Sequence, residues 1–493
     1  MTWHAYHEST KHSVESLRRA RHELDWANMP DPFRDYEGVP VFDLPSDPPT
    51  PETPALDVFH GVAGVTPAGD GPSFLSQLLF HSAAISASKR APSTGYRYAL
   101  RVNPSSGNLH PTECHFLTRG LKAWPDGLYH YRPSAHMAEQ RALGDLAMQL
   151  VGSSAPIVFV LTSIPWREAW KYRDRAYRYC LLDMGHAWQA LALAARAIGC
   201  DSFAAGHFPD DEVAQCCRLN DDEWPMLIVE LSGGSIPVRE PDAGETVWYG
   251  GHPNQLSKER IVYKQIDEIH NATKLRQRAC RDISPAEMAS TGSGEINLPP
   301  PAFSSRAFGE VTRTRRSALD FLGGTQSMSL TQLSAILAAA TGPFSADFAS
   351  VNFIQLYLYA HRVDGLQAGV YRLWPQTVRL EQIKSGDQRV AAAGLSLGQD
   401  LAGNACVAFS MIGDLERAVR AHGDRGYRYV HFEAGAIGQY LYLASEALGL
   451  RATGIGAFYD EEVHRYLHLA PPQGQVVYHF AIGFPAPDPR LDA

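Results

Sequence analysis

The stretch RDRAYRYCLLDMGHAWQALALAARAIG, at residues 173–199, returns as GDRGYRYVHFEAGAIGQYLYLASEALG at residues 423–449. The two copies lie 250 residues apart and align without a gap. Matches that keep this offset are Tyr177/Tyr427, Arg178/Arg428, Tyr179/Tyr429, Asp183/Glu433, Gly185/Gly435, Gln189/Gln439, Gly206/Gly456, Phe208/Phe458, Asp210/Asp460 and Gly233/Gly483. Solenoid repeats recur every ~20–50 residues, so this longer spacing indicates a duplicated domain. Two such domains in one chain pack most simply as an intramolecular pseudo-twofold dimer.

The residue pattern around the repeat predicts an α+β fold in each half. Residues 180–199 are apolar on nearly all sides and end at Gly199, as a buried central helix does, and residues 430–449 repeat this pattern. Short apolar, β-branched runs bounded by turn residues are typical of central strands. These runs are 155–162, 226–234, 406–413 and 476–483. We therefore expect two fused α+β domains.

Length and composition set the domain organisation and exclude several classes of function. The 493 residues, 45% of them hydrophobic, are enough for two ordinary cores. We expect an N-terminal extension at 1–49, a first half at 50–237, a connection at 238–304 with a helix near 256–277, and a second half at 305–493. The net charge of −9 with scattered Lys and Arg predicts no nucleic-acid partner. No apolar run is long enough to span a membrane.

The start of the chain and its cysteines favour a cytoplasmic protein. The first residues, MTWHAYHESTKHS, are polar and contain no apolar segment of the signal-peptide type. The cysteines are odd in number and form no CxxC pair, which indicates reduced thiols. They are Cys114, Cys180, Cys200, Cys216, Cys217, Cys280 and Cys406.

The candidate chemistry concentrates in RVNPSSGNLHPTE, residues 101–113. Pro104, Ser105, Ser106, Gly107 and Asn108 form a turn with two hydroxyls, an amide and a glycine that allows close approach. Such a loop can present short donors and backbone N–H groups to a flat polar ring. Taken alone, the same five residues also fit an ordinary surface turn.

Together with DGLYHYRP and KYRDRAYRY, this loop resembles the nitroreductase superfamily, and within it the SagB-type (thiazole/oxazole-forming) dehydrogenases. The resemblance covers both halves and implies an FMN-dependent oxidoreductase with the cofactor between two domains. It implies that one domain gives an Arg-Arg-Ser segment to the phosphate and a glycine loop to the ring, while the other gives the Pro-Ser-Ser loop. The matching residues are Arg315, Arg316, Ser317, Gly454, Ile455 and Gly456 on one side, and Pro104, Ser105, Ser106 and Asn108 on the other. Arg490 matches a further phosphate cation of the family.

The duplication predicts that only one flavin site is complete. Where the second half has Arg315-Arg316-Ser317, we expect the first half to have Glu52-Thr53-Pro54, which cannot hold a phosphate. Where the first half has the Pro-Ser-Ser loop, the second half has ADFAS, residues 346–350. A second basic pair, Lys89-Arg90, follows a predicted helix instead of preceding one, so we expect it to lie apart from the phosphate.

Lys171 and Tyr172 are the catalytic candidates, because SagB-type enzymes resemble this stretch and use a Lys-Tyr pair in catalysis. The second half has Ala421-His422 in this place. A desolvated lysine, or a tyrosine whose pKa a cation lowers, could take the proton while hydride goes to flavin N5. The alternative is a packed tyrosine beside a lysine that reaches solvent. His110, Tyr177 and Tyr179 are expected to be structural.

Three functions remain open from the sequence. They are a SagB-type dehydrogenase of a peptide-derived or small organic substrate, with biosynthetic partner enzymes; an NAD(P)H-dependent nitro or quinone reductase; and a flavin-binding scaffold without turnover. The Lys-Tyr pair favours the first. His4, His7 and His12 lack the spacing of a metal site, and the Gly454–Gly456 segment is not the fingerprint of a Rossmann domain.

Overall fold

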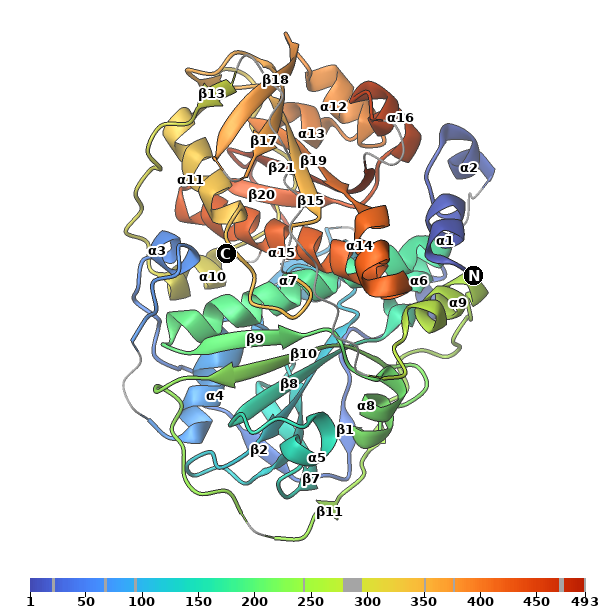
Figure 1. The fold of residues 1–493 in the computed structure, drawn as a ribbon, viewed down its shortest axis with the longest axis vertical. Helices are drawn as coiled ribbons and strands as arrows, with labels where there is room; N and C mark the ends of the chain where they lie inside the picture. The colour runs from blue at the N-terminus through green and yellow to red at the C-terminus, as the bar shows by residue number, and fades with distance from the viewer. Residues whose placement is uncertain are drawn as a thin grey trace.

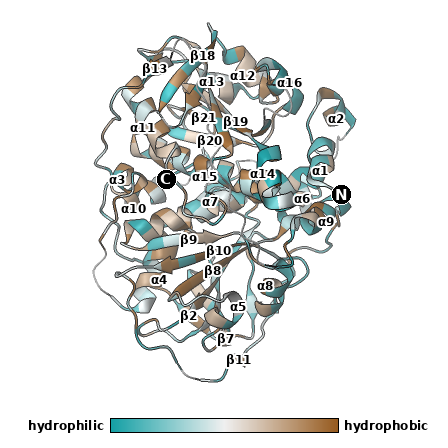
Figure 2. Cartoon of the chain, viewed as in Figure 1, coloured by the Kyte–Doolittle hydropathy of each residue, from teal (hydrophilic) through white to brown (hydrophobic). Residues whose placement is uncertain are grey.

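The computed structural model describes residues 1–19, 23–65, 69–92, 95–242, 244–277, 295–349, 352–375, 377–469 and 474–491. Each half forms an antiparallel sheet, and two long helices lie between the two sheets (Figure 1). These are α7 (Ala176–Ala197) and α15 (Gly426–Ala447), which confirm the predicted central helices. Apolar residues concentrate on the strands and on the helices between them (Figure 2). Among the described residues, every helix is too short or too polar to span a bilayer.

Apart from the short edge strand Val247–Trp248 of the first half, the two sheets have the same order of equivalent strands, and Glu295–Asn297 of the second half is equivalent to Val41–Asp43 of the first. In the first half the order is β11 (Val247–Trp248), β7 (Met137–Leu143), β6 (Gly127–Arg132), β5 (Thr112–Thr118), β8 (Ile157–Ser163), β10 (Trp224–Ser232), β9 (Asp201–Ala205), with β2 (Val41–Asp43) also on β7. In the second half it is β13 (Glu295–Asn297), β18 (Arg379–Ser385), β17 (Gly369–Trp374), β15 (Ile354–Ala360), β19 (Val407–Gly413), β21 (Gln475–Gly483), β20 (Arg451–Ile455). The predicted central strands are β8, β10, β19 and β21.

Eight of the other helices form four equivalent pairs. They are α3 (Ala55–Phe59) with α10 (Phe308–Thr314), α4 (Gly71–Phe80) with α11 (Leu330–Ala340), α6 (Pro165–Tyr172) with α14 (Leu415–His422), and α8 (Asp210–Cys216) with α16 (Asp460–Tyr466). Smaller elements are α2 (Val14–Arg19), α5 (Ala147–Val151), α12 (Arg389–Leu395), α13 (Asp400–Asn404), and the short strand pairs β1 (Tyr36–Glu37) with β12 (His252–Pro253) and β14 (Met328–Ser329) with β16 (Val363–Asp364).

The pseudo-twofold axis passes where α7 and α15 cross. A Cβ atom on Gly185 would lie 2.1 Å from the carbonyl oxygen of Phe432, and one on Gly435 would lie 2.1 Å from that of Leu182. These glycines therefore set the closest approach of the two helices. One predicted match needs correction: Ser232, not Gly233, is the partner of Gly483, because Ser232 pairs with Asp201 as Gly483 pairs with Arg451.

A second repeat, missed in the sequence, joins the N-terminal extension to the connection between the halves. HESTK at 7–11 in and after α1 (Trp3–Ser9) corresponds to HNATK at 270–274 in and after α9 (Lys264–Thr273). The Thr10 hydroxyl accepts from Arg178 Nε at 3.0 Å, and the Thr273 hydroxyl accepts from Arg428 Nε at 2.8 Å. The predicted connection thus carries the second copy of a segment that the extension also carries. Its residues 278–294 lie outside the described residues.

These two segments cover two buried ion clusters that join the halves. Arg175, the residue before α7, binds Asp460 of the second half at 3.1 Å, and Arg178 of α7 binds the same carboxylate at 2.9 Å. In the equivalent cluster, Arg425 and Arg428 of the second half bind Asp210 of the first. Each half therefore holds the other through a carboxylate between two arginines.

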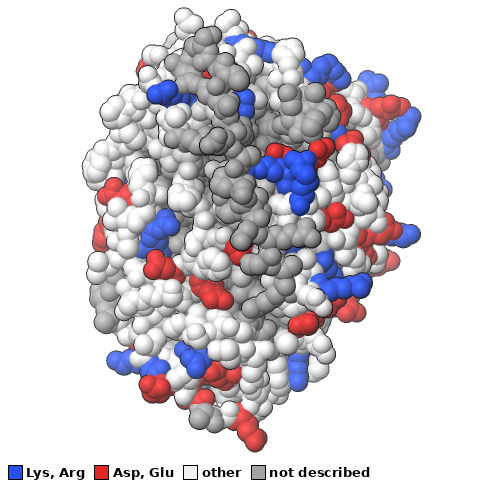
Figure 3. All heavy atoms as spheres, in the orientation of Figure 1, with Lys and Arg blue, Asp and Glu red and all other residues white. Residues whose placement is uncertain are grey.

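The surface shows no basic stripe of the kind that binds nucleic acid on the face drawn in Figure 3. Acidic and basic side chains of the described residues are interspersed there, with wide uncharged areas between them.

Candidate functional site

Hydrogen bonds fix the loop Pro104–Asn108 to α7, the central helix of the same half. The Asp183 carboxylate accepts from the Ser105 hydroxyl at 2.6 Å, from the Ser106 hydroxyl at 2.9 Å and from the Ser106 backbone N–H at 3.0 Å. The Asn108 side-chain nitrogen donates to the Ala99 carbonyl at 2.9 Å. The loop is thus built before any ligand binds, and Asn108 contributes to its shape.

Lys171 and Tyr172 lie directly against this loop. Gly107 has a positive φ of 58°, and a Cβ atom on it would lie 2.7 Å from the Tyr172 hydroxyl and 3.2 Å from Lys171 Nζ. The rings of Tyr172 and Tyr179 are 4.4 Å apart. The structure therefore brings the candidate catalytic pair to the candidate flavin loop, and glycine is needed where they meet.

The idea that a cation lowers the pKa of Tyr172 is wrong. Burial raises the pKa of Tyr172 well above its usual range, and Glu168, Tyr179 and Asp183 raise it further. A neutral tyrosine in this place donates a hydrogen bond and does not act as a phenolate base.

The Arg-Arg-Ser segment reaches across from the second half to the backbone that leads into the loop. Arg315 donates from Nε to the Val102 carbonyl at 3.0 Å and from Nη2 to the Arg101 carbonyl at 3.1 Å. Arg316 donates to the Ser86 carbonyl at 2.9 Å and to its hydroxyl at 3.1 Å. Two buried guanidinium groups of one half are therefore fixed against the other.

These arginines form a site suited to an anion. Arg315 Nη1 is buried and has no hydrogen-bond partner in the described part of the chain. Burial lowers the pKa of Arg316 to about 10, and repulsion from Arg315 and Arg451 adds to this effect. A buried unpaired donor among like charges is costly unless an anion compensates it. The residues present therefore fit a phosphate group.

The glycine loop, Gly454–Gly456, comprises the last two residues of β20 and the residue after them, and it packs closely against tyrosines. The Gly454 N–H donates to the Tyr442 hydroxyl at 2.8 Å, and that hydroxyl also lies 2.9 Å from the Ser317 hydroxyl. A Cβ atom on Gly454 would lie 1.9 Å from the Tyr478 hydroxyl, and one on Gly456 would lie 2.1 Å from the Tyr179 ring. Tyr442 thus joins Ser317 of the arginine segment to the glycine loop.

Sequence reasoning missed Tyr442 and Tyr478, although a signal was present. The equivalent positions of the first half hold Ala192 and Leu227, so each tyrosine appears only on the side that carries Arg315. A polar aromatic residue that replaces an apolar one in only one copy of a repeat marks a position with an added role.

Arg490 and Lys89 meet on one carboxylate. Arg490 binds Asp488 through Nε and Nη2, both at 2.8 Å, and Lys89 Nζ lies 2.7 Å from the same side chain. Burial lowers the pKa of Lys89; Asp488 opposes this effect, whereas Arg490 and Arg315 reinforce it. The expectation that Lys89 lies apart from the phosphate segment is therefore wrong.

The hairpin β3 (Ile85–Arg90) and β4 (Arg97–Arg101) explains that error. It lies between α4 and the Pro-Ser-Ser loop, and the second half has no equivalent among its described residues. The hairpin carries Lys89 to the C-terminal segment, where the Arg90 N–H donates to the Arg490 carbonyl at 2.8 Å. Sequence position relative to a helix did not reveal this approach.

In the second possible site, where the two halves exchange roles, residues of the ADFAS segment contact the first half directly. Ala346 bridges Ala204, and the Asp347 carboxylate accepts from the Gly206 and His207 N–H groups at 2.8 and 3.0 Å. The Phe348 ring stacks on Tyr429, with centroids 4.3 Å apart. The ADFAS segment therefore lies against the end of β9, which is the first-half equivalent of the glycine loop. Its last residue, Ser350, lies outside the described residues.

The match of Glu52-Thr53-Pro54 to the arginine segment is wrong. The Ala55 N–H donates to the Arg306 carbonyl and the Phe308 N–H to the Thr53 carbonyl, at 3.0 and 2.9 Å. Pro54 is thus the partner of Ala307, and counting onward places Val62-Ala63-Gly64 opposite Arg315-Arg316-Ser317. An Ala-Leu-Asp sequence after both segments gave the false alignment. The first half still lacks the arginines.

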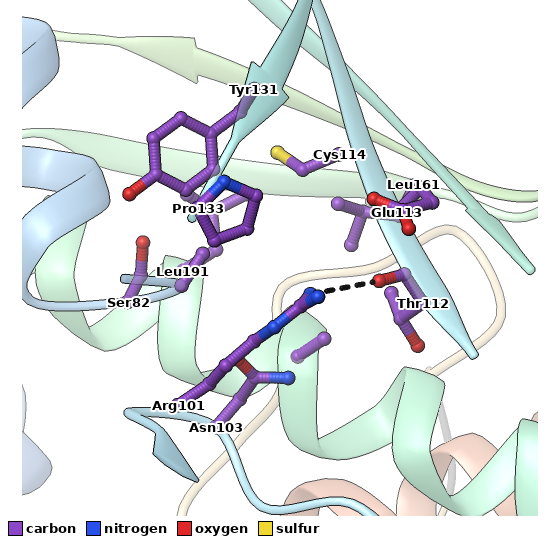
Figure 4. A pocket seen from close by; sticks show the side chains of 12 residues that line it. Ser82, Arg101, Asn103, Thr112, Glu113, Cys114, Tyr131, Pro133, Leu161 and Leu191 are labelled. Atoms are coloured by element: carbon purple, nitrogen blue, oxygen red, sulfur yellow. Dashed lines mark hydrogen bonds between the residues drawn. The ribbon is translucent and has the colours of Figure 1, made fainter. Parts of the chain in front are cut away.

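A small cavity lies beside the segment that leads into the loop. It has a volume of about 30 Å³, and Arg101, Asn103, Glu113 and Tyr131 are among its lining residues (Figure 4). The Arg101 side chain points into it and donates to the Thr112 carbonyl at 3.4 Å. This space suits about one water molecule and not a substrate.

Comparison with known proteins places both halves in one family. The family described as "Nitroreductase family" matches residues 82–233 and 312–484. "Putative nitroreductase MJ1384" of Methanocaldococcus jannaschii is 30% identical over 167 residues, which cover 32% of this chain and 83% of that protein. A crystal structure of the same description from Anabaena variabilis matches with a TM-score of 0.78 and 26% identity, over 98% of this chain and 99% of that one.

A processing enzyme is also among the relatives. The microcin B17-processing protein McbC of Escherichia coli is 30% identical over 146 residues, which cover 27% of this chain and 54% of McbC. The match spans about half the length of McbC. It agrees with the SagB-type resemblance of the loop and the Lys-Tyr segment, and the family assignment excludes a scaffold without activity. The chain belongs to the nitroreductase family, as an oxidoreductase with two nitroreductase domains in one polypeptide.

Proposed function

We propose that the protein is an FMN-dependent dehydrogenase with one flavin site, which both halves build together. The main support is the buried, unpaired Nη1 of Arg315, which lies beside the backbone that leads into the Pro-Ser-Ser loop. Arg315, Arg316 and Ser317 would hold the phosphate, with Arg490 nearby. Gly454, Ile455 and Gly456 would allow the ring to approach, and Pro104, Ser105 and Ser106 would face it.

Bound FMN would supply the acceptor for a hydride from a peptide-derived or small organic substrate. The residues of this chain would manage the proton that the substrate loses. Because burial keeps Tyr172 neutral, we assign proton acceptance to Lys171 and a hydrogen bond to the substrate or ring to Tyr172. Both side chains lie within contact distance of the Gly107 position.

The proposal includes partners and a compartment. The similarity to McbC, a microcin-processing protein, favours a substrate that other biosynthetic enzymes deliver. The described cysteines are Cys114, Cys180, Cys200, Cys216, Cys217 and Cys406, and all are free thiols, in keeping with a cytoplasmic protein. Cys280 lies outside the described residues.

A second candidate is an NAD(P)H-dependent reductase of nitro compounds or quinones, which the similarity to MJ1384 favours. Anaerobic mixing of the purified protein with NADH or NADPH separates the two. The dehydrogenase proposal predicts no rapid bleaching of the flavin, whereas the reductase predicts bleaching within the time of turnover. Heat release should yield FMN, and FAD at full occupancy would contradict both candidates.

A further inference from the structure

Two buried carboxyl groups lie directly beneath the Pro-Ser-Ser loop. Glu168 of α6 is fully buried and Asp183 of α7 is 3% exposed. Asp183 accepts the hydrogen bonds from Ser105 and Ser106. The Glu168 carboxyl faces Asp183 and Ser105, but no hydrogen bond of good geometry reaches either of its oxygens. One carboxyl is therefore saturated with donors and the other is not.

The hydrogen bonds determine where the charge resides. All the groups that bind Asp183 donate to it, so Asp183 accepts in its ionised form. A second charge on Glu168 would be desolvated and unpaired beside a like charge, which is strongly unfavourable. Burial accordingly raises the pKa of Glu168 well above its usual range and that of Asp183 to about 7. Above about pH 7 the pair therefore holds one proton, on Glu168, and one negative charge, on Asp183.

The surroundings of the pair are mostly uncharged. Lys171 of α6 is the basic side chain that faces Glu168, and Tyr172 of the same helix faces both carboxyls. Cys180 of α7 and Tyr478 of β21 also face Asp183. The charge on Asp183 is thus balanced mainly by the donors of the loop.

The pair exists only on the side of the intact loop. Glu433 replaces Asp183 in the second half, where its carboxylate accepts from the Phe353 and Ile354 N–H groups. Ala418 stands where the first half has Glu168. Loss of the second carboxyl thus accompanies loss of the flavin loop, which links the pair to the function of the site and not to the fold.

We propose that Glu168 and Asp183 are a proton-sharing pair that positions the Pro-Ser-Ser loop and makes reduction of a flavin held there depend on pH. This inference rests on the proposed function. An ionised Asp183 keeps both serine hydrogens turned toward itself, so the loop offers oxygen lone pairs to its ligand. A protonated Asp183 releases a hydroxyl to donate instead.

The charge also acts on electron transfer. Reduction delivers a hydride, and with it one negative charge, next to the charge on Asp183. One proton taken from solvent by Asp183 removes that repulsion, without a change in any other bond. Reduction therefore becomes more favourable when Asp183 is protonated, and the reduction potential gains a pH dependence near the pKa of this group.

Infrared spectroscopy of the flavin-free protein tests the pair itself. At about pH 9, Asp183 and Glu433 are ionised and the neutral Glu168 should give a carboxylic C=O band. Glu168→Gln should remove this band, and Glu433→Gln should leave it. A band that persists in Glu168→Gln, or no such band in the wild type, overturns the pair. This result stands whether or not the protein binds flavin, so it fails independently of the proposed function.

Reduction potentials measured against pH test the effect on the cofactor. The wild type and Glu433→Gln should show an added inflection near pH 7. Asp183→Asn should lose the inflection and have a more positive potential at pH 8, whereas Glu168→Gln should keep the inflection because Asp183 remains. An Asp183→Asn protein with the wild-type potential and inflection overturns the coupling, as does a Glu168→Gln protein that keeps no inflection. If Asp183→Asn binds no flavin, Glu168→Gln still decides the question.

Discussion

At the scale of single residues, the intact site depends on side chains that only one half carries. Arg315 and Arg316 have Val62 and Ala63 as partners in the repeat, and Tyr172 has His422. Arg315 keeps one buried N–H donor without a partner among the described residues. A buried donor without a partner lowers the stability of the protein unless a ligand binds to it. These residues are better explained by a ligand than by the stability of the fold.

Lys171→Ala and Tyr172→Phe should each retain the flavin but lower turnover of the true substrate by about 10²-fold or more, the usual scale for acid–base groups. Neither side chain belongs to the arginine segment, so each variant should lose turnover while flavin binding stays unchanged. Flavin content by absorbance and steady-state rates measure the two effects. His422→Phe, at the equivalent position of the filled site, should keep wild-type turnover. Unchanged turnover in both first-half variants would return Lys171 and Tyr172 to a structural role.

The sequence predicted part of the site at this scale. The arginine segment, the serines and the Lys-Tyr pair follow from a resemblance and lie in one region. Glu168 was missed because a buried glutamate in an amphipathic helix looks like a surface residue. Lys89 was misplaced because a hairpin, and not a helix, determines its position.

At the scale of secondary structure, the long repeat predicts α7 and α15 because a nearly all-apolar helix must be buried. It does not predict their angle or their closest approach, which depend on two glycines that face each other across the axis. The sequence also did not predict that β10 and β21 align at an offset one residue longer than the helices do. The length of the turn before a strand does not change the apolar pattern of that strand, so the pattern does not reveal the difference.

Gly185→Ala and Gly435→Ala should each destabilise the protein by about 1–3 kcal/mol or more, the usual range for overpacking. Each added methyl group would meet a backbone carbonyl of the opposite helix, which cannot move aside as a side chain can. Denaturant unfolding measures the loss. Gly394→Ala in α12, where no heavy atom lies within 4 Å of the new Cβ, is the control and should lose nothing. Equal stability of all three variants would contradict the close crossing.

At the scale of the whole molecule, two carboxylates join the halves. Burial raises the pKa of Asp460, but Arg175 and Arg178 more than offset it, and the pKa ends below its usual range. The same balance with Arg428 and Arg425 lowers the pKa of Asp210. Because these pKa values are lowered in the folded state, their contribution to stability is present above pH ~4 and is lost as the pH falls further.

Asp460→Asn should therefore lower the free energy of unfolding by about 3–5 kcal/mol near neutral pH, because two buried arginines lose their partner. The difference from the wild type should shrink in acid. Glu462→Gln, which removes an exposed ion pair on the same helix, should cost less than about 1 kcal/mol. A loss of that small size in Asp460→Asn would show that the cluster does not hold the halves together.

The division of the chain into one complete and one filled site is the central claim, and the ratio of flavin to protein tests it most directly. Flavin absorbance against protein concentration should give one FMN per chain, because ADFAS fills the second site and Val62-Ala63 cannot bind its phosphate. Arg315→Ala/Arg316→Ala should empty the protein of flavin, and Arg90→Ala, at an exposed position, should not. Two flavins per chain, or full flavin content in the double arginine variant, would contradict the account.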